Sequence, residues 1–101
     1  MKRILITGAG SLIGQGIIKT IKKIKKKYYL VGTDYFKDSI GFYWVNKSYI
    51  LPDLLKKKNL GEWKKKFLKI LEKEKIDLVI PGLDFELEHL FEIKNTLEKY
   101  K

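Results

Sequence analysis

Residues 3–7 read RILIT and residues 8–14 read GAGSLIG, and these two segments decide the fold. A short run of branched apolar residues that ends at glycines is typical of a buried parallel strand followed at once by a helix. Apolar residues then recur at helical spacing with lysines between them: Ile13, Ile17, Ile21 and Ile24. This pattern predicts a helix over residues 12–26 that buries one apolar face.

Three further strands are predicted along the chain. Each is a short apolar run closed by a turn-forming residue: residues 28–33, 48–51 and 76–80. Between the first two of these runs, residues 35–47 are irregular, and Asp38 or Ser39 is expected to cap one short helical turn.

Two more helices are predicted in the second half of the chain. The first has an apolar face formed by Trp63, Phe67, Ile70 and Leu71. The second covers residues 85–99, with Asp84 as its expected N-cap. Its apolar face is formed by Leu87, Leu90, Phe91 and Leu97.

Strands that alternate with helices predict one α/β domain over residues 1–101. Because crossovers between parallel strands are right-handed, the strand order is expected to be 3-2-1-4. The predicted architecture is therefore a three-layer, Rossmann-like open sheet with helices on both faces.

Composition excludes several kinds of site and gives a strongly basic chain. The chain has no cysteine, which excludes a disulfide scaffold, a thiol nucleophile and a cysteine-ligated metal, and the single His89 excludes a multi-histidine metal site. Residues 1–69 carry 17 basic and 4 acidic groups, whereas residues 70–101 carry 5 and 8. A basic nucleic-acid-binding domain is one alternative, but 21 of the 22 basic residues are lysine, which favours solvated faces.

Neither a membrane span nor a secretion signal is predicted. The apolar N-terminal stretch is interrupted at Thr7 and Gly8, and no run approaches the roughly 18 apolar residues that a membrane span needs. We therefore expect a cytoplasmic protein.

The predicted topology places a candidate site where the strand order changes direction. Ligands of open parallel sheets bind at the carboxyl ends of the strands at this point. Here it lies between the first and fourth strands, where residues 8–12 meet residues 81–84. Gly8 and Gly10 allow a tight turn, and the free N–H groups of the helix that follows form a ready anion site.

A dinucleotide-binding module of an oxidoreductase is the main alternative from these residues. Gly8 and Gly10 fit a dinucleotide fingerprint, but the third glycine, Gly14, comes one residue late. Asp34 closes the second strand 20 residues after Gly14, where a carboxylate could bind a ribose hydroxyl. No tyrosine–lysine pair lies in a helix at the spacing of short-chain dehydrogenases.

Acidic residues at the start of the last helix are a second candidate feature. Carboxylates there interact favourably with the helix dipole. Alternatively, Asp84 or Glu86 faces the crevice and receives an amine or a substrate hydroxyl.

Three blocks of the chain, taken in order, resemble the N-terminal, pre-ATP-grasp domain of ATP-grasp proteins. They read ILITGAGSLIGQGIIK, VGTDYFKDSIGFYWVNKSYILPDLL and EKIDLVIPGLDFEL. The resemblance covers residues 2–98, is most telling at Ile13, Gly14 and Gln15, and is greatest to carbamoyl-phosphate-synthase-like members.

The resemblance implies the substrate-side domain of a ligase that joins a carboxylate to an amine through an acyl phosphate. ATP and magnesium would bind a later grasp module, so the chain alone is expected to be inactive and to contain no catalytic or metal-binding residue. The implied substrate or anion-binding positions are Gly8, Ala9, Gly10, Ser11, Asp34, Pro81, Asp84 and Glu86. The implied partners are the grasp module, a small carboxylate or amine, and a second copy of the chain. We expect a fragment or a stand-alone remnant.

Overall fold

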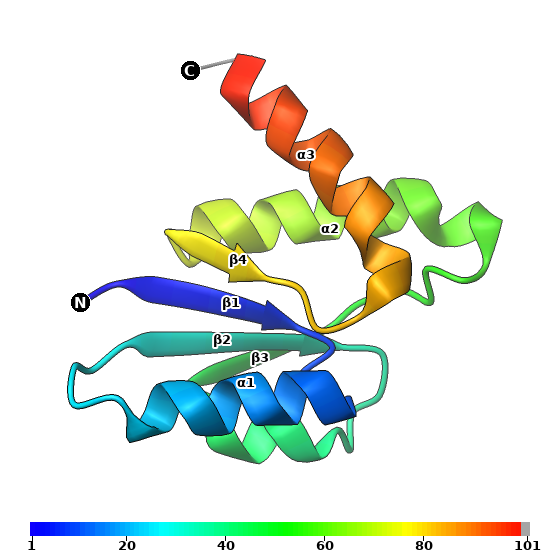
Figure 1. The fold of residues 1–101 in the computed structure, drawn as a ribbon. Coiled ribbons are helices and arrows are strands. Elements are labelled where there is room, and N and C mark those ends of the chain that lie inside the picture. Colours follow the sequence, from blue (N-terminus) through cyan, green and yellow to red (C-terminus); the bar gives the residue numbers. More distant parts are fainter. Residues whose placement is uncertain (100–101) are drawn as a thin grey trace.

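The chain forms a four-stranded parallel sheet in the order β3–β2–β1–β4, with helices on both faces (Figure 1). The computed structural model describes residues 1–99, with side chains described as far as Asn95. The strands are β1 (Arg3–Thr7), β2 (Tyr29–Asp34), β3 (Lys47–Ile50) and β4 (Leu78–Ile80). The predicted α/β class and the strand order 3-2-1-4 are confirmed.

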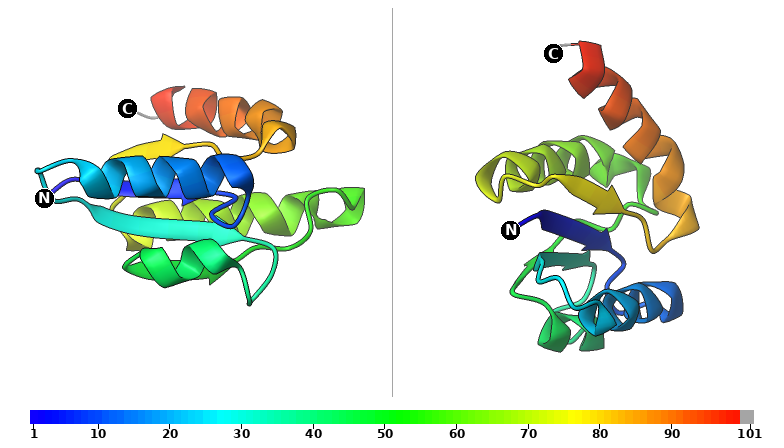
Figure 2. Two further views of the ribbon diagram at one scale, coloured as in Figure 1. Left: turned by 60° about the horizontal axis from the view of Figure 1, so that its bottom comes forward. Right: turned by 60° about the vertical axis from the view of Figure 1, so that its left-hand side comes forward.

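The helices lie in two layers, one on each face of the sheet (Figure 2). They are α1 (Leu12–Lys23), α2 (Leu60–Lys73) and α3 (Leu87–Lys99), with short 3₁₀ helices η1 (Ile40–Trp44), η2 (Lys57–Asn59) and η3 (Asp84–Glu86). The connection from β1 to β2 and that from β3 to β4 run in opposite directions across the sheet. Because both are right-handed, α1 covers one face while α2 and α3 cover the other.

Alternate side chains of the strands enter two separate cores. The core under α1 contains Ile4, Ile6, Ala9, Ile18 and Leu30. The core under α2 and α3 contains Leu5, Val31, Leu51, Leu54, Trp63, Phe67, Ile70 and Ile93. The predicted apolar face of α2 is confirmed, because Trp63, Phe67 and Ile70 are buried and Leu71 packs against them.

Helix α1 is buried most deeply at Gly14 and Ile18, and only Ile17 and Ile21 of the predicted isoleucine stripe pack against the core. Ile13 is 57% exposed, and Ile24 lies beyond the end of the helix. A Cβ atom on Gly14 would lie 2.1 Å from the carbonyl oxygen of Gly8, so only glycine allows this close approach. The contact turns the helix by part of a turn relative to the predicted face.

Two elements are shorter than predicted. Helix α1 ends at Lys23 because Ile24 is extended and the lysines after it offer no apolar contact. Strand β4 begins at Leu78, because Lys75 adopts a left-handed conformation with φ of 50° and the N–H of Ile76 still donates to α2. Residues 74–75 form the exit turn of α2, and the N–H of Asp77 already donates to the carbonyl of Arg3 in β1.

The predicted last helix is divided into η3 and α3. Asp84 is the first residue of η3 and forms no side-chain cap, so its predicted role as the N-cap is wrong. The helix meets the core through Leu90 and Ile93, which leaves Leu87 and Phe91 exposed. The side chain of Leu97 lies outside the described residues.

A polar clamp joins the amino ends of the strands to the end of α2. The guanidinium of Arg3 pairs with Glu74 at 3.1 Å and lies 3.9 Å from the ring centre of Tyr29. The other carboxylate oxygen of Glu74 accepts the hydroxyl of Tyr49. Burial, together with this hydrogen bond, raises the pKa of Tyr49 to about 12.

Candidate functional site

The glycine loop turns β1 into α1 and is held by its own hydrogen bonds. Gly8 has φ of +58°, a conformation that favours glycine. The hydroxyl of Ser11 accepts the N–H of Gly14 at 2.9 Å and donates to the carbonyl of Gly82 at 3.0 Å. The first bond caps α1, and the second joins the loop after β1 to the loop after β4.

The carboxylate of Asp34 joins the glycine loop to the loop after β2. One oxygen accepts the N–H of Gly10 and the hydroxyl of Ser39, both at 2.8 Å. The other accepts the N–H of Tyr35 at 2.9 Å. Asp34 is only 7% exposed. Its carboxylate therefore takes the place that an anionic ligand would have at the donor of the glycine loop.

Backbone contacts close the crevice between the loops after β1 and β4. A Cβ atom on Gly82 would lie 2.2 Å from the carbonyl oxygen of Thr7, and the N–H of Gly82 donates to the Thr7 hydroxyl at 3.0 Å. Together with the Ser11–Gly82 bond, these contacts hold the two loops against each other at Gly82. Pro81 is half-buried beside them, and Asp84 is exposed.

A cavity of about 570 Å³ opens beside these loops at the carboxyl ends of the strands, and we call it the carboxyl-end pocket. The loops that follow all four strands contribute to it. Its lining consists of Gly10, Ser11, Asp34, Tyr35, Phe36, Asp38, Ser39, Asp53, Leu55, Leu83 and Phe85. The topology thus assembles the pocket from segments that are far apart in the sequence.

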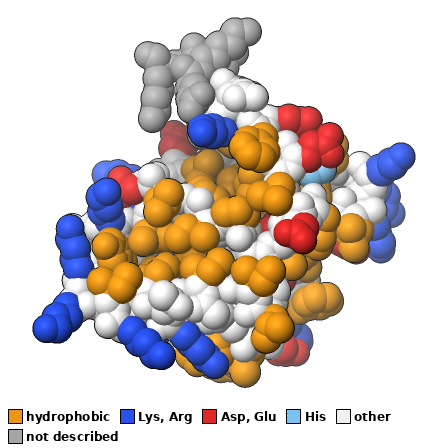
Figure 3. Space-filling model, viewed as in Figure 1, with side chains coloured by type: hydrophobic (Ala, Val, Ile, Leu, Met, Phe, Trp, Pro, Cys, Tyr) orange, Lys and Arg blue, Asp and Glu red, His pale blue; other side chains and the backbone are white. Residues whose placement is uncertain are grey.

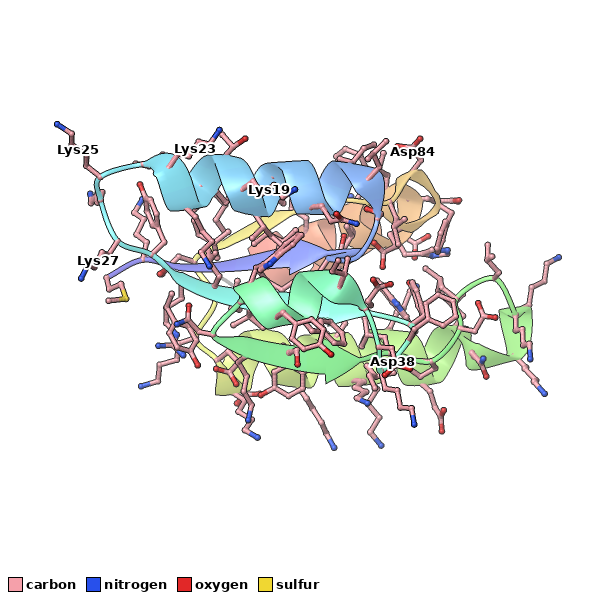
Figure 4. All side chains as sticks on the ribbon, turned by 90° about the horizontal axis from the view of Figure 1, so that it is seen from below. Lys19, Lys23, Lys25, Lys27, Asp38 and Asp84 are labelled. Carbon is pink, nitrogen blue, oxygen red and sulfur yellow. The ribbon has the colours of Figure 1, made fainter. Side chains whose placement is uncertain are left out.

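The walls of the carboxyl-end pocket are apolar, and its charged side chains are acidic. The rings of Tyr35 and Phe85 lie 5.8 Å apart in one wall. Three aspartates line the pocket, whereas no lysine or arginine does so within the described part of the chain. Asp38 lies at this end of the sheet, and Lys25 and Lys27 lie at the opposite end (Figure 4). The pocket is therefore an acidic region on a chain of net charge +10.

A buried polar cluster lies behind the Tyr35 wall. The hydroxyl of Tyr35 donates to Oε2 of Glu86 at 2.7 Å and accepts the indole N–H of Trp63 at 3.1 Å. Burial raises the pKa of Tyr35, and the adjacent Glu86 adds to the increase. Burial also raises the pKa of Glu86, although the neighbouring hydroxyls of Thr7 and Tyr35 act in the opposite direction.

The predicted site residues fall into three groups. Gly10, Ser11 and Asp34 line the carboxyl-end pocket. The two residues before them, Gly8 and Ala9, support the loop from behind, and Pro81 and Asp84 are not part of the lining. Glu86 is fully buried behind Tyr35 and does not face the crevice.

Sequence reasoning missed most of the other polar groups of the pocket. Asp38 was predicted only as a helix cap, and Asp53 and the role of Tyr35 were not predicted. A signal was available for two of them, since Tyr35 and Asp53 follow closely after predicted strands. Carboxyl ends of parallel strands meet at one edge, so such residues are brought together by the fold.

Comparison with protein families gives one match. The family model described as the PylC-like, N-terminal domain matches residues 4–101. A search of curated proteins gave no match. Within residues 1–99, no helix is long and apolar enough to cross a membrane, and no group of three acidic or histidine residues could hold a metal ion.

Proposed function

This chain belongs to the PylC-like N-terminal domain family, the pre-ATP-grasp domain of ATP-grasp ligases, and on that premise we propose a role in binding the amine substrate. In this proposal the chain forms the substrate side of a carboxylate–amine ligase of the carbamoyl-phosphate-synthase-like kind. The grasp module, in the same or a separate chain, supplies the rest of the active site. The chain alone is not catalytic.

The acidic carboxyl-end pocket is the observation that carries this proposal. Asp38 and Asp53 are exposed at its rim, and aromatic rings form its wall. An ammonium group on a short apolar chain matches both features, because carboxylates attract the charge and the rings accept the alkyl part. A carboxylate substrate would meet like charges there.

The residues of the pocket do not fit ATP with magnesium. The N–H of Gly10, which could donate to a phosphate, already donates to Asp34, and the aspartates of the pocket would repel a triphosphate. We therefore assign ATP and magnesium to the grasp module, as the family resemblance implies. The same bonds of Asp34 argue against the dinucleotide alternative.

Exposed apolar side chains around the pocket support the grasp module as the partner. Leu12, Phe36 and Leu55 are 88%, 71% and 71% exposed, and the last two line the pocket. Large apolar side chains gathered near a pocket are typical of an interaction surface. In this arrangement the grasp module would close over a substrate held in the pocket.

An amide-shift NMR titration of the labelled chain tests the proposed substrate class. Butylammonium and butyrate share an apolar tail and differ in charge. We expect saturable shifts at Tyr35, Asp38 and Phe85 with butylammonium and none with butyrate. NAD, NADP and magnesium-ATP should give no saturable shifts, and the chain should not hydrolyse ATP above background.

Variants that remove carboxylates inside and outside the pocket provide the control for this titration. Asp38→Asn combined with Asp53→Asn should weaken butylammonium binding about 10-fold or more, since each lost charge–charge contact contributes on the order of 1 kcal/mol. Glu72→Gln removes an exposed carboxylate near the far end of α2 and should have no effect. Equal binding of butyrate, or localised shifts with a dinucleotide, would contradict the proposal.

A further inference from the structure

Glu86 is a fully buried carboxyl group whose hydrogen-bonding neighbours are neutral. Its exposed fraction is 0%, and the hydroxyl of Tyr35 donates a hydrogen bond to its Oε2 atom. Its other oxygen, Oε1, has no hydrogen-bond partner among the described residues. A buried charge with an unpartnered oxygen is strongly unfavourable, so this environment favours the neutral acid.

Glu74 shows how the same chain surrounds a buried glutamate that has a cationic partner. Glu74 is 6% exposed, comparable with Glu86. It pairs with the guanidinium of Arg3, and both of its carboxylate oxygens have hydrogen-bond partners. Glu86 has no such cation within the described part of the chain. The two residues therefore form a natural pair for comparison.

We propose that Glu86 is a positioning residue that carries a proton in the folded chain and holds Tyr35 in the wall of the carboxyl-end pocket. A proton on Oε1 turns an unpartnered acceptor into a donor. The Thr7 hydroxyl lies close enough to influence this carboxyl group, and its oxygen, which already accepts the N–H of Gly82, has a second lone pair with which to accept. The neutral acid thus accounts for both oxygens of Glu86.

Tyr35 transmits the state of Glu86 to the pocket. Its hydroxyl bonds Glu86 and Trp63, while its ring lines the pocket beside Phe85. Loss of the proton would place a charge in an apolar region, and the segment that carries Glu86 would be driven toward water. The wall formed by Tyr35 and Phe85 would then loosen.

Other ionisable groups lie around Glu86 on β2, η3 and α3. Asp34, at the end of β2, raises the pKa of Glu86 by charge repulsion, and burial is the larger cause. On α3, the ring of His89 lies 6.2 Å from the ring of Trp63, and its Nδ1 atom is buried without a hydrogen-bond partner among the described residues. Asp84 and Glu88, on the same segment as Glu86, are exposed.

A carbon-13 NMR titration of the glutamate side-chain carboxyls tests the proposal directly in the unmodified chain. We expect the Glu86 signal to change at a pH well above the ordinary glutamate value of about 4.3. The ring signals of Tyr35 should change at the same midpoint. A Glu86 midpoint in the ordinary range, or a carboxylate signal already present at neutral pH, would overturn the proposal.

The Glu86→Gln variant provides the second test, because glutamine resembles the neutral acid and has no proton to lose. The pKa of Glu86 is raised in the folded state, so its stabilising contribution is complete below the unfolded value of about 4.3 and is lost as pH rises through the folded value. The urea midpoint of Glu86→Gln relative to wild type should therefore rise with pH.

Glu74→Gln is the matched control for this measurement. It removes the charge that pairs with Arg3 and should lower the urea midpoint at neutral pH, where Glu86→Gln lowers it little or raises it. An equal loss of stability in both variants would mean that Glu86 is ionised, and this result would contradict the proposal.

The proposal concerns the pocket assigned to the amine substrate, but its tests use no ligand. The two proposals can therefore fail separately. Glu86 can prove to be ionised while butylammonium still binds, or butylammonium can fail to bind while Glu86 titrates as expected. In Glu86→Gln, the Tyr35 ring signals should no longer change with pH. A purely structural role would leave that pH dependence in place.

Discussion

Asp34 illustrates how one side chain can fill a site that the sequence pattern offers to a ligand. Its carboxylate accepts three hydrogen bonds, from Gly10, Ser39 and Tyr35. These bonds connect the loops after β1 and β2 and fix one side of the carboxyl-end pocket. At the residue scale, the glycine loop therefore holds two loops of the fold together and is also part of a candidate site.

We predict that Asp34→Asn lowers the free energy of unfolding by about 2 kcal/mol, because hydrogen bonds to a buried carboxylate contribute more than neutral ones. Asp53→Asn is the control, since Asp53 is exposed and bonds a nearby N–H at 3.0 Å. Its effect should stay within about 0.5 kcal/mol. Urea unfolding at pH 7 measures both, and similar losses would contradict the role of Asp34.

At the scale of an element, α1 is positioned by a glycine as well as by its isoleucines. A Cβ atom added at Gly14 would meet the backbone of the glycine loop, whereas one added at Gly16 in the same helix would have no neighbouring atom within 4 Å. The two glycines share a helix and differ only in what surrounds them. A comparison of the two positions therefore distinguishes the effect of helix propensity from the effect of packing.

We predict opposite signs for Gly14→Ala and Gly16→Ala. Gly14→Ala places Cβ against the backbone of Gly8, which cannot move freely, and should cost about 2 kcal/mol. Gly16→Ala restricts the unfolded chain and fills open space, so it should stabilise by about 0.5–1 kcal/mol. Thermal unfolding distinguishes them, and a stabilising Gly14→Ala would show that α1 can shift outward.

At the scale of the whole molecule, the topology leaves one face of β4 without a helix. Because the connection from β3 to β4 is right-handed, it carries α2 on the opposite face, and α3 packs against the same core as α2. Leu78 lies beside Ile4, which is buried in the core under α1, whereas Leu78 itself is 50% exposed. A band of hydrophobic side chains crosses the surface on this view of the molecule (Figure 3).

We predict that the free chain self-associates through this face when salt screens its net charge of +10. Sedimentation velocity at low and high salt measures the effect. Leu78→Lys should abolish the association, whereas Ile50→Lys, on the other edge strand, should leave it intact. A wild-type chain that stays monomeric at high salt and high concentration would contradict the prediction.

The sequence by itself determined the fold class, the strand order and the apolar face of α2. These follow from local patterns, since branched runs closed by turn residues form buried strands and handed connections order them. The tertiary structure alone decided the orientation of α1. A pattern of apolar residues could not indicate that Gly14 faces the sheet, because glycine has no side chain. It also decided the composition of the carboxyl-end pocket. Tyr35, Asp53 and Glu86 come together only through long-range packing, and whether each faces water or the interior depends on neighbours distant in sequence.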